Sequence, residues 1–295
     1  MSSKSALKTA VSAIQKLYPI ELAERSWDNV GLLVDSTVAS TFSESTSAPK
    51  PFKILLAIDL TRAVCREAVQ KRVNLILAYH PFIFRGLKQI GSEIDPQQVS
   101  LVEIIKNNIN VYCPHTSVDA VKGGVNDWLV ESIVNGDKSL IKSSKPIDPS
   151  DGADMEENGM GRYVELNQPL KIFDIVSSIK SSLNIPYLQL ASAQTPSLEN
   201  HSDIQTVAIC AGSGGELFKR YLNNPSTLPD LIYTGELSHH EILAFKERGC
   251  NVIVCNHSNT ERGYLKTISK LLKEELSSDY SIEISYADKD PLQVV

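Results

Sequence analysis

The chain has 295 residues, of which 42% are hydrophobic and 22% charged, and its net charge is −6. The length exceeds what one small domain needs, and the hydrophobic fraction can build a core, so extensive disorder is excluded. An acidic chain lacks the basic surface of a dedicated nucleic-acid binder, so no direct nucleic-acid partner is expected. No apolar run reaches the roughly 18 residues of a membrane span, so no membrane partner is expected either.

The cysteines and the N-terminus bear on the compartment. There are five cysteines, an odd number, and no CxxC motif, which favours free thiols in a reducing compartment. The first acidic residue is Glu21, and three lysines precede it, as in a weak mitochondrial presequence. However, Ala6, Val11, Ile14 and Leu17 keep a helical period that fits an ordinary first helix. We therefore expect a cytoplasmic protein, with a mitochondrial one as the alternative.

The first half of the chain alternates short apolar strands with helices. We predict, in order, a strand over 54–58, a helix over 61–71, a strand over 74–79, a helix over 99–108 and a strand over 109–113. Such alternation requires crossover connections and largely parallel pairing.

A polar stretch then indicates a domain boundary. Residues 142–161 carry two prolines, three glycines and an acidic cluster, which is typical of a linker. We expect a first α/β domain over 1–141, the linker over 142–161 and a second α/β domain over 162–295, and leave open whether the C-terminal tail returns to the first domain. The Ser/Thr-rich residues 36–51 predict a flexible insertion.

The second half repeats the alternation. It predicts strands over 163–166, 187–191, 206–211, 231–236 and 251–255, and helices over 170–183, 215–222 and 239–248. The predicted class is α/β, with one sheet in each half.

The histidines gather where strands end. Five of the six lie at or just past a predicted strand end, namely His80, His115, His239, His240 and His257, whereas His201 lies in a polar loop and receives no role. Open α/β sheets bind ligands beyond the carboxyl ends of their strands. These histidines are therefore candidates for one site.

Carboxylates accompany two of these histidines. The segment HTSVD (115–119) follows one strand and HSNTE (257–261) follows another. His257 and Glu261 are four residues apart, so on a helix they would share a face and could share an ion. Imidazole combined with carboxylate suits zinc, iron or manganese.

Other motifs have simpler explanations. GSGGE (212–216) lacks the lysine of a phosphate-binding loop, which favours a tight strand–helix turn. Ser238 and Glu241 have capping-box spacing around His239 and His240. Asp28 and Asn29 are simple turn formers in this interpretation. No GxSxG motif supports a serine hydrolase.

Five segments in order resemble one family. WDNVGLL (27–33), YHPFIF (79–84), HTSVD (115–119), GELSHHE (235–241) and HSNTERG (257–263) are similar to the NIF-three-like family (NGG-interacting factor three-like), whose bacterial members carry the name GTP cyclohydrolase 1 type 2 homolog. The resemblance runs from Trp27 to the C-terminal tail. It implies two α/β domains facing each other across a cleft, two divalent metal ions per chain and a toroidal hexamer.

The resemblance also implies the ligands. Carried over residue by residue, they are His80, Asp119, His257 and Glu261, with Asp119 and Glu261 able to bridge the ions. Bacterial members have His-His-Pro where this chain has Tyr79-His80-Pro81. A phenol ionises only near pH 10, so Tyr79 is a poor ligand and one ion lacks an imidazole, for which His115 is a candidate replacement.

Two functions of different classes follow. The first is a metal-dependent, hydrolase-like enzyme acting on a phosphoester, nucleotide or amide, with His239 or His240 as acid or base. The alternative is a non-enzymatic oligomeric scaffold that binds a protein partner, such as a transcriptional adaptor, and uses its metals structurally.

Overall fold

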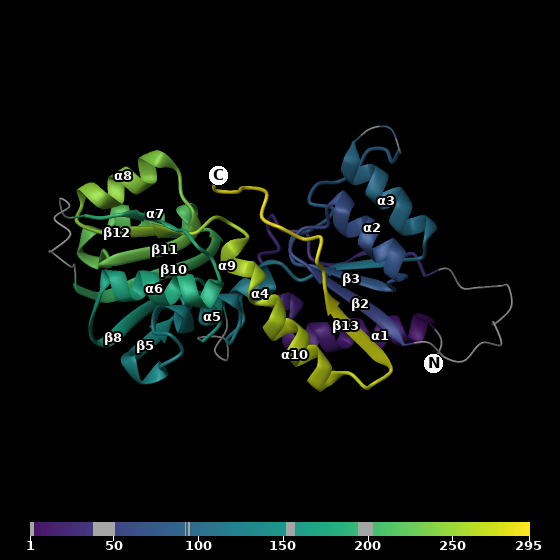
Figure 1. Cartoon of the computed structure of the whole chain (residues 1–295), viewed down its shortest axis with the longest axis horizontal. Helices are drawn as coiled ribbons and strands as arrows, with labels where there is room; N and C mark the ends of the chain where they lie inside the picture. Colours follow the sequence, from purple (N-terminus) through teal and green to yellow (C-terminus); the bar gives the residue numbers. More distant parts are fainter. Residues whose placement is uncertain (1–2, 38–50, 92, 94, 152–156, 194–202) are drawn as a thin grey trace, which may run out of the picture. The chain divides into compact units, whose positions relative to one another are not determined.

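The computed structural model describes residues 3–37, 51–91, 93, 95–151, 157–193 and 203–295. The chain divides into two compact units, the first made of Met1–Val118 and Leu265–Lys289, the second of Asp119–Tyr264 and Asp290–Val295. Each unit has its own mixed sheet, which confirms the predicted α/β class with two sheets (Figure 1).

The sheet of the first unit has the order β1-β4-β3-β2-β13. Its strands are β1 (Gly31–Val34), β2 (Phe52–Ala57), β3 (Leu75–Ala78), β4 (Asn110–Cys113) and β13 (Tyr280–Ile284). β1 runs antiparallel to β4, and all other pairs are parallel. The predicted largely parallel pairing is therefore right for this unit, to which β13 adds a strand from near the C-terminus.

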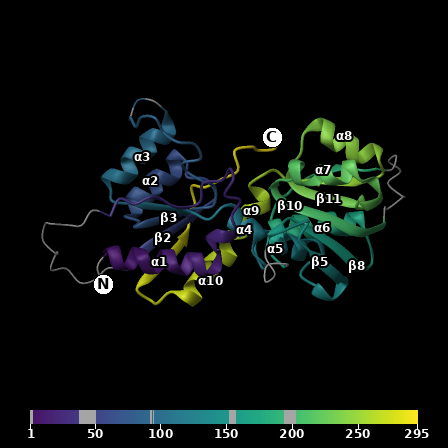
Figure 2. The same ribbon diagram turned by 180° about the vertical axis from the view of Figure 1, so that it is seen from behind.

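Helices cover both faces of this sheet. α2 (Arg62–Lys71) and α3 (Pro96–Lys106) lie side by side on one face, and α1 (Ser3–Leu17) and α10 (Leu265–Glu275) on the other (Figures 1 and 2). The central strands β2, β3 and β4 are buried along almost their whole length because both faces of the sheet are covered. Leu55 and Ala57 of β2 pack in the same core cluster as α2 and α3.

Local signals set the helix ends. The Thr61 hydroxyl accepts from the Val64 N–H at the start of α2, and Arg72 ends that helix in the left-handed conformation. Asp95 caps α3, and Pro96 occupies its first turn. A hydroxyl or a carboxylate thus accepts from an otherwise unpaired backbone N–H at the start of each of these two helices.

The sheet of the second unit has the order β5-β8-β10-β11-β12-β9. Its strands are β5 (Ile141–Lys145), β8 (Arg162–Lys171), β9 (Gln189–Ala191), β10 (Asp203–Ser213), β11 (Leu231–Glu236) and β12 (Asn251–Val254). Only β10–β11 and β11–β12 are parallel, so largely parallel pairing is wrong for this unit. The alternation of strands and helices predicts which elements form, but it does not fix which strands become neighbours.

Four helices cover this second sheet. α7 (Gly215–Asn223) and α8 (His239–Glu247) pack on one face, where Phe218, Tyr221 and Phe245 join the sheet's core cluster. α5 (Val125–Ile133) and α6 (Ile172–Leu183) lie on the other face (Figure 1). The consecutive crossovers β10–α7–β11–α8–β12 bring the ends of three parallel strands to one edge.

The segment 142–161 carries β5, the short strands β6 (Asp148–Pro149) and β7 (Gly159–Met160), and residues outside the described part. Most of the predicted insertion over 36–51, and His201, also lie outside the described residues. Among the described residues, no helix is both long and apolar enough to cross a membrane.

Candidate metal centre

His80 follows the buried strand β3, and a carboxylate holds its ring. Its Nδ1 lies 2.9 Å from an Asp59 carboxylate oxygen, and Asp59 follows the neighbouring parallel strand β2. The bond favours the tautomer with the proton on Nδ1, in which Nε2 would be the nitrogen that binds a metal. Pro81 has no N–H and cannot continue the strand's ladder, so the chain turns here.

His115 follows β4 and is held in the same way. Its Nδ1 lies 2.8 Å from an oxygen of Asp28, whose side chain is fully buried. The Thr116 hydroxyl donates to the other carboxylate oxygen at 2.6 Å. His115 has a φ of 32°, a conformation that residues with a side chain rarely adopt and that often marks functional sites.

Asp28 is therefore more than a turn former. Burial acts to raise the pKa of its carboxyl, but the hydrogen bond and charge of His115 and the bonds from Thr116 and the Asn29 N–H outweigh burial, and the pKa is lowered. An ionised carboxylate can accept both the imidazole N–H and the hydroxyl. It fixes the ring of His115 from the side opposite Nε2.

Three rings cluster at these strand ends in the first unit. The ring centres of His80 and His115 are 5.5 Å apart, and Tyr79 lies 5.3 Å from His80 and 6.1 Å from His115. Tyr79 is 2% exposed, so its ring is part of the core beneath the two imidazoles.

In the second unit, His257 follows β12 and meets two carboxylates. Its Nδ1 lies 3.0 Å from an oxygen of Glu236, at the end of β11, and its Nε2 lies 3.3 Å from an oxygen of Glu261. Glu261 is 3% exposed and belongs to the short helix α9 (Asn259–Arg262), whereas His257 precedes this helix. The two side chains nevertheless meet, although they do not share a helix face. Burial of a carboxylate beside an imidazole Nε2 is typical of a cation site.

Glycines make room for these donors. Gly212, at the end of β10, has a φ of +60°, and a Cβ there would lie 2.8 Å from both Glu261 Oε1 and His257 Nε2. A Cβ on Gly235 would lie 2.8 Å from the Cα of His257. The side chains of Glu261 and His257 thus pack directly against glycine, and the missing Cβ leaves room beside their donor atoms. Gly212 is also the first residue of the GSGGE segment.

Asp119 lies on the short helix α4 (Thr116–Ala120) and is the first residue of the second unit. Its carbonyl accepts from the Asn126 side chain at 2.9 Å, and Asn126 accepts from the Ala211 N–H at 2.9 Å. Burial, and then the negative charges of Asp119 and Glu261, raise the pKa of the Cys210 thiol. Both carboxylates therefore lie close enough to act on one thiol.

His239 and His240 open α8, and both are exposed. The predicted capping box is present, because Ser238 accepts from the Glu241 N–H and Glu241 accepts from the Ser238 N–H. The two rings lie 5.3 Å apart in an edge-on arrangement. Their predicted acid or base role stays a prediction.

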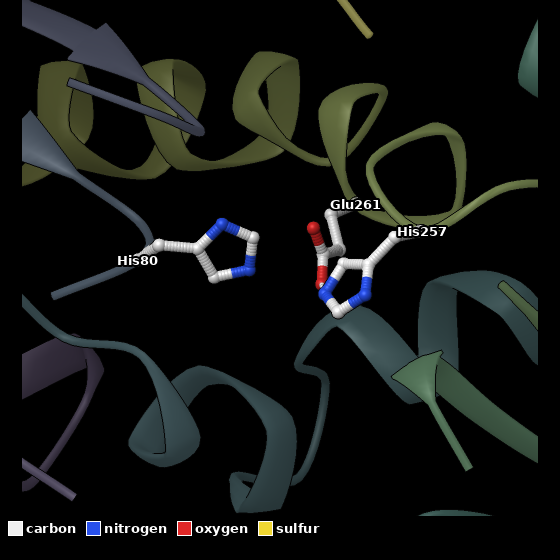
Figure 3. A group of neighbouring side chains, drawn as sticks. All are labelled: His80, His257 and Glu261. Atoms are coloured by element: carbon white, nitrogen blue, oxygen red, sulfur yellow. Dashed lines mark ion pairs between the residues drawn. The ribbon is translucent and has the colours of Figure 1, made fainter. Parts of the chain in front are cut away.

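Figure 3 draws the side chains of His80, His257 and Glu261. Each offers one ligand atom, and these atoms lie within 4.8 Å of one another, so the group could hold a metal ion. In the part of the chain that the structure describes, this is the one such group of three or more, and it includes neither Asp119 nor His115.

Sequence reasoning missed the partners of the imidazoles. Asp59 and Glu236 were visible as acidic residues at strand ends, but their pairing with His80 and His257 depends on which strands are neighbours. Asp28 is 87 residues away from His115, and no local pattern joins them.

The fold and these side chains define the class, a two-sheet α/β protein with a histidine–carboxylate group that could hold a metal ion. The family model described as Duf34/NIF3 (NGG1p interacting factor 3) matches residues 5–291. The chain belongs to this family, as the resemblance of its motifs predicted.

Relatives match along their whole length. The chain is 43% identical to "NGG1-interacting factor 3" of Saccharomyces cerevisiae, covering 99% of this chain and 98% of that protein. It is 34% identical to the "GTP cyclohydrolase 1 type 2 homolog" of Clostridium perfringens, covering 98% and 99%. A solved structure of a Bacillus cereus protein related to NIF3 has a TM-score of 0.77 at 18% identity, covering 97% and 98%, and this likeness shows the fold alone.

Proposed function

We propose that this protein binds two divalent metal ions, zinc, iron or manganese, and acts as a metal-dependent, hydrolase-like enzyme. The observation that carries the proposal is the group of His80, His257 and Glu261, whose donor atoms lie within 4.8 Å of one another. Two imidazoles with a carboxylate are the donor set of catalytic rather than structural zinc. In the proposal Asp119 and Glu261 also reach the second ion.

Neighbouring residues orient these donor side chains in the protein without metal. Asp59 and Glu236 hold Nδ1 of His80 and His257, so in each ring Nε2 would be the ligand nitrogen. Gly212 keeps the space beside Glu261 and His257 open. When bound, the ions would lower the pKa of a bound water and polarise a phosphoryl, amide or ring carbon.

The proposed substrates are nucleotides, phosphoesters or amides. The Clostridium relative's name refers to nucleotide chemistry, so nucleotides stand beside phosphoesters and amides among the substrates to be tested. His239 and His240 are exposed and lie outside the proposed set of metal ligands, so they are candidates for the general acid or base.

Metal analysis and turnover test the proposal together. Protein purified with metal present should carry two equivalents by mass spectrometry of its metals, and a crystal should give anomalous signal beside His80 and His257. Asp119→Ala and Glu261→Ala should lose metal and turnover while the fold survives. Metal-replete protein with no divalent ion at these residues would refute the proposal.

The scaffold alternative has a specific basis in the name of the yeast relative, which is that of an interacting factor. In that alternative a toroidal hexamer binds a protein partner, such as a transcriptional adaptor, and the metals hold the fold. Light scattering gives the molar mass of the assembly and therefore the number of chains in it. Fully metal-loaded protein that turns over no phosphoester, nucleotide or amide, yet retains its partner, would favour the scaffold.

A further inference from the structure

Two large aromatic side chains of the first unit are exposed next to each other. Trp27 is 54% exposed and Phe84 is 46% exposed, and their ring centres are 6.3 Å apart. Trp27 also contacts the His115 ring edge-on, with 6.0 Å between the ring centres, and the ring of His80 lies 5.5 Å beyond that of His115. Large apolar side chains that are exposed together often mark a place where a ligand or partner binds.

The backbone that carries these two rings is held in place. The Asn29 side chain donates to the Ile83 carbonyl, so the segment of Trp27 is tied to the segment of Phe84. Phe82, two residues before Phe84, is buried in the core cluster of this unit. The two rings are therefore positioned before a ligand binds, and little order has to be created on binding.

The segment over 79–91 is basic. It contains Arg85 and Lys88 and no acidic residue, although the chain as a whole has a net charge of −6. Both basic side chains are exposed, and neither has an ion-pair partner among the described residues. The carboxylates of Asp28 and Asp59 lie at the imidazoles of this unit and hydrogen-bond them. The surface thus matches a ligand that combines a flat ring with a negative charge.

Nucleotides combine these two features. Every base has an aromatic face that can stack on tryptophan or phenylalanine, and arginine and lysine bind phosphate. A purely apolar ligand would gain nothing from Arg85 and Lys88. A long nucleic acid would need a broad basic surface, which the acidic composition of the chain does not favour. A mononucleotide therefore fits the aromatic and basic side chains best.

We propose that Trp27 and Phe84 stack on the base of a nucleotide whose phosphate is attracted by Arg85 and Lys88. This inference rests on the proposed function, because it narrows the substrates of that enzyme to nucleotides. It uses residues of the first unit alone, and recognition of the base requires no metal ion. Trp27 and Phe84 determine which substrate binds and take no part in the reaction itself.

Calorimetric titration of chelator-treated protein with AMP, ribose 5-phosphate and adenosine separates the contributions of base and phosphate. AMP should bind about 5–100-fold more tightly than ribose 5-phosphate, because it adds a stacked base. Trp27→Ala should remove most of this preference, whereas Trp27→Phe, which keeps an aromatic ring, should retain it. Arg85→Gln should weaken AMP about 10-fold and leave adenosine unchanged, because adenosine has no phosphate.

Tyr187→Ala is the matched control, because Tyr187 is an aromatic residue of the second unit that is 63% exposed. It should bind AMP like the wild type, and circular dichroism should show all variants folded. Fluorescence gives an independent readout, since Trp27 and Trp128 are the two tryptophans of the chain. In Trp128→Phe the remaining emission comes from Trp27, and AMP should quench it.

The outcomes separate this inference from the proposed function. Equal binding of AMP and ribose 5-phosphate by the wild type, or an unchanged preference in Trp27→Ala, would overturn the inference and leave the metal-dependent function standing. AMP binding as expected, in a protein that binds no divalent metal, would support the inference and refute the metal-dependent function. A smaller molar mass of Trp27→Ala in light scattering, with unchanged AMP binding, would show that these rings join copies of the chain and would overturn the inference.

Discussion

Gly212 packs directly against two predicted metal donors. An alanine there would be strained by the φ of +60° and would press its Cβ against Glu261 and His257. We expect Gly212→Ala to lower zinc affinity about 10-fold or more and to destabilise the protein by about 1–3 kcal/mol. Isothermal titration with zinc and thermal unfolding measure the two effects.

Gly136→Ala is the control for backbone strain. Gly136 has a φ of +80°, but nothing lies within 4 Å of a Cβ built there. This variant should lose stability from its backbone and keep its zinc affinity. Equal zinc affinity of the two alanine variants would show that the space beside the donors does not matter.

The cysteine thiols are predicted to be unreactive. Burial raises the pKa of Cys255 to about 12, and burial, with a smaller contribution from the charge of Asp28, raises that of Cys113 to about 12. Since the thiolate is the reactive form, an aromatic disulfide reagent at pH 8 should modify these residues far more slowly in the native than in the unfolded protein. Rapid native modification at Cys113 or Cys255, located by mass spectrometry, would contradict this.

At the scale of elements, continuous apolar runs predicted the central strands well. Residues 231–236 were predicted as a strand and form β11 with the same limits, and β3 lies inside the predicted 74–79. These strands are buried on both faces, so their pattern is strong and local. β13 was missed because Tyr280–Ile284 alternates polar and apolar residues at the edge of its sheet.

The site was predictable only in its parts. His80, His257 and Glu261 follow strands, and that position is visible in the sequence. The bonds from Asp59 to His80 and from Asp28 to His115 join residues 21 and 87 positions apart. Such pairs depend on strand order and on a turn's exact path, which single-sequence patterns do not determine.

Glu67 of α2 anchors the segment that follows β13. Its carboxylate is 2.8 Å from Lys71 Nζ and accepts from the Ser285 hydroxyl and the Ala287 N–H. Burial acts to raise the pKa of Glu67, but the bonds from Lys71, Ser285 and the backbone prevail, and the pKa lies below its ordinary 4.5. The ionised carboxylate therefore stabilises the fold.

Glu67→Gln should cost about 2 kcal/mol at pH 7, because charged hydrogen bonds are lost and an amide N–H faces donors. A lowered folded pKa means that the stabilisation is complete above the unfolded pKa and disappears as the pH falls through the folded one. In urea unfolding the wild type and variant should thus converge as the pH drops below the ordinary glutamate value of 4.5. A difference that stays constant down to pH 2 would contradict the role of ionisation.

At the scale of the whole molecule, part of the excess of acidic residues lies around the candidate metal site. The chain has 35 acidic and 29 basic residues. Several of the acids hold imidazoles, among them Asp28, Asp59 and Glu236. Others, Asp119 and Glu261, lie near the Cys210 thiol and, after burial, contribute to raising its pKa. A cation would relieve the mutual repulsion of such carboxylates, so metal binding should stabilise the folded chain.

Free zinc at 100 times its dissociation constant should stabilise the protein by about 2.7 kcal/mol per site. For a chain of 295 residues, that corresponds to roughly 4 °C in unfolding temperature per site. Scanning calorimetry should show this rise on adding zinc to chelator-treated protein. Glu261→Gln should lose most of the zinc-dependent rise, since it removes a donor that is 3% exposed, while His240→Asn should keep it. An equal rise in Glu261→Gln and the wild type would mean that zinc stabilises the chain elsewhere.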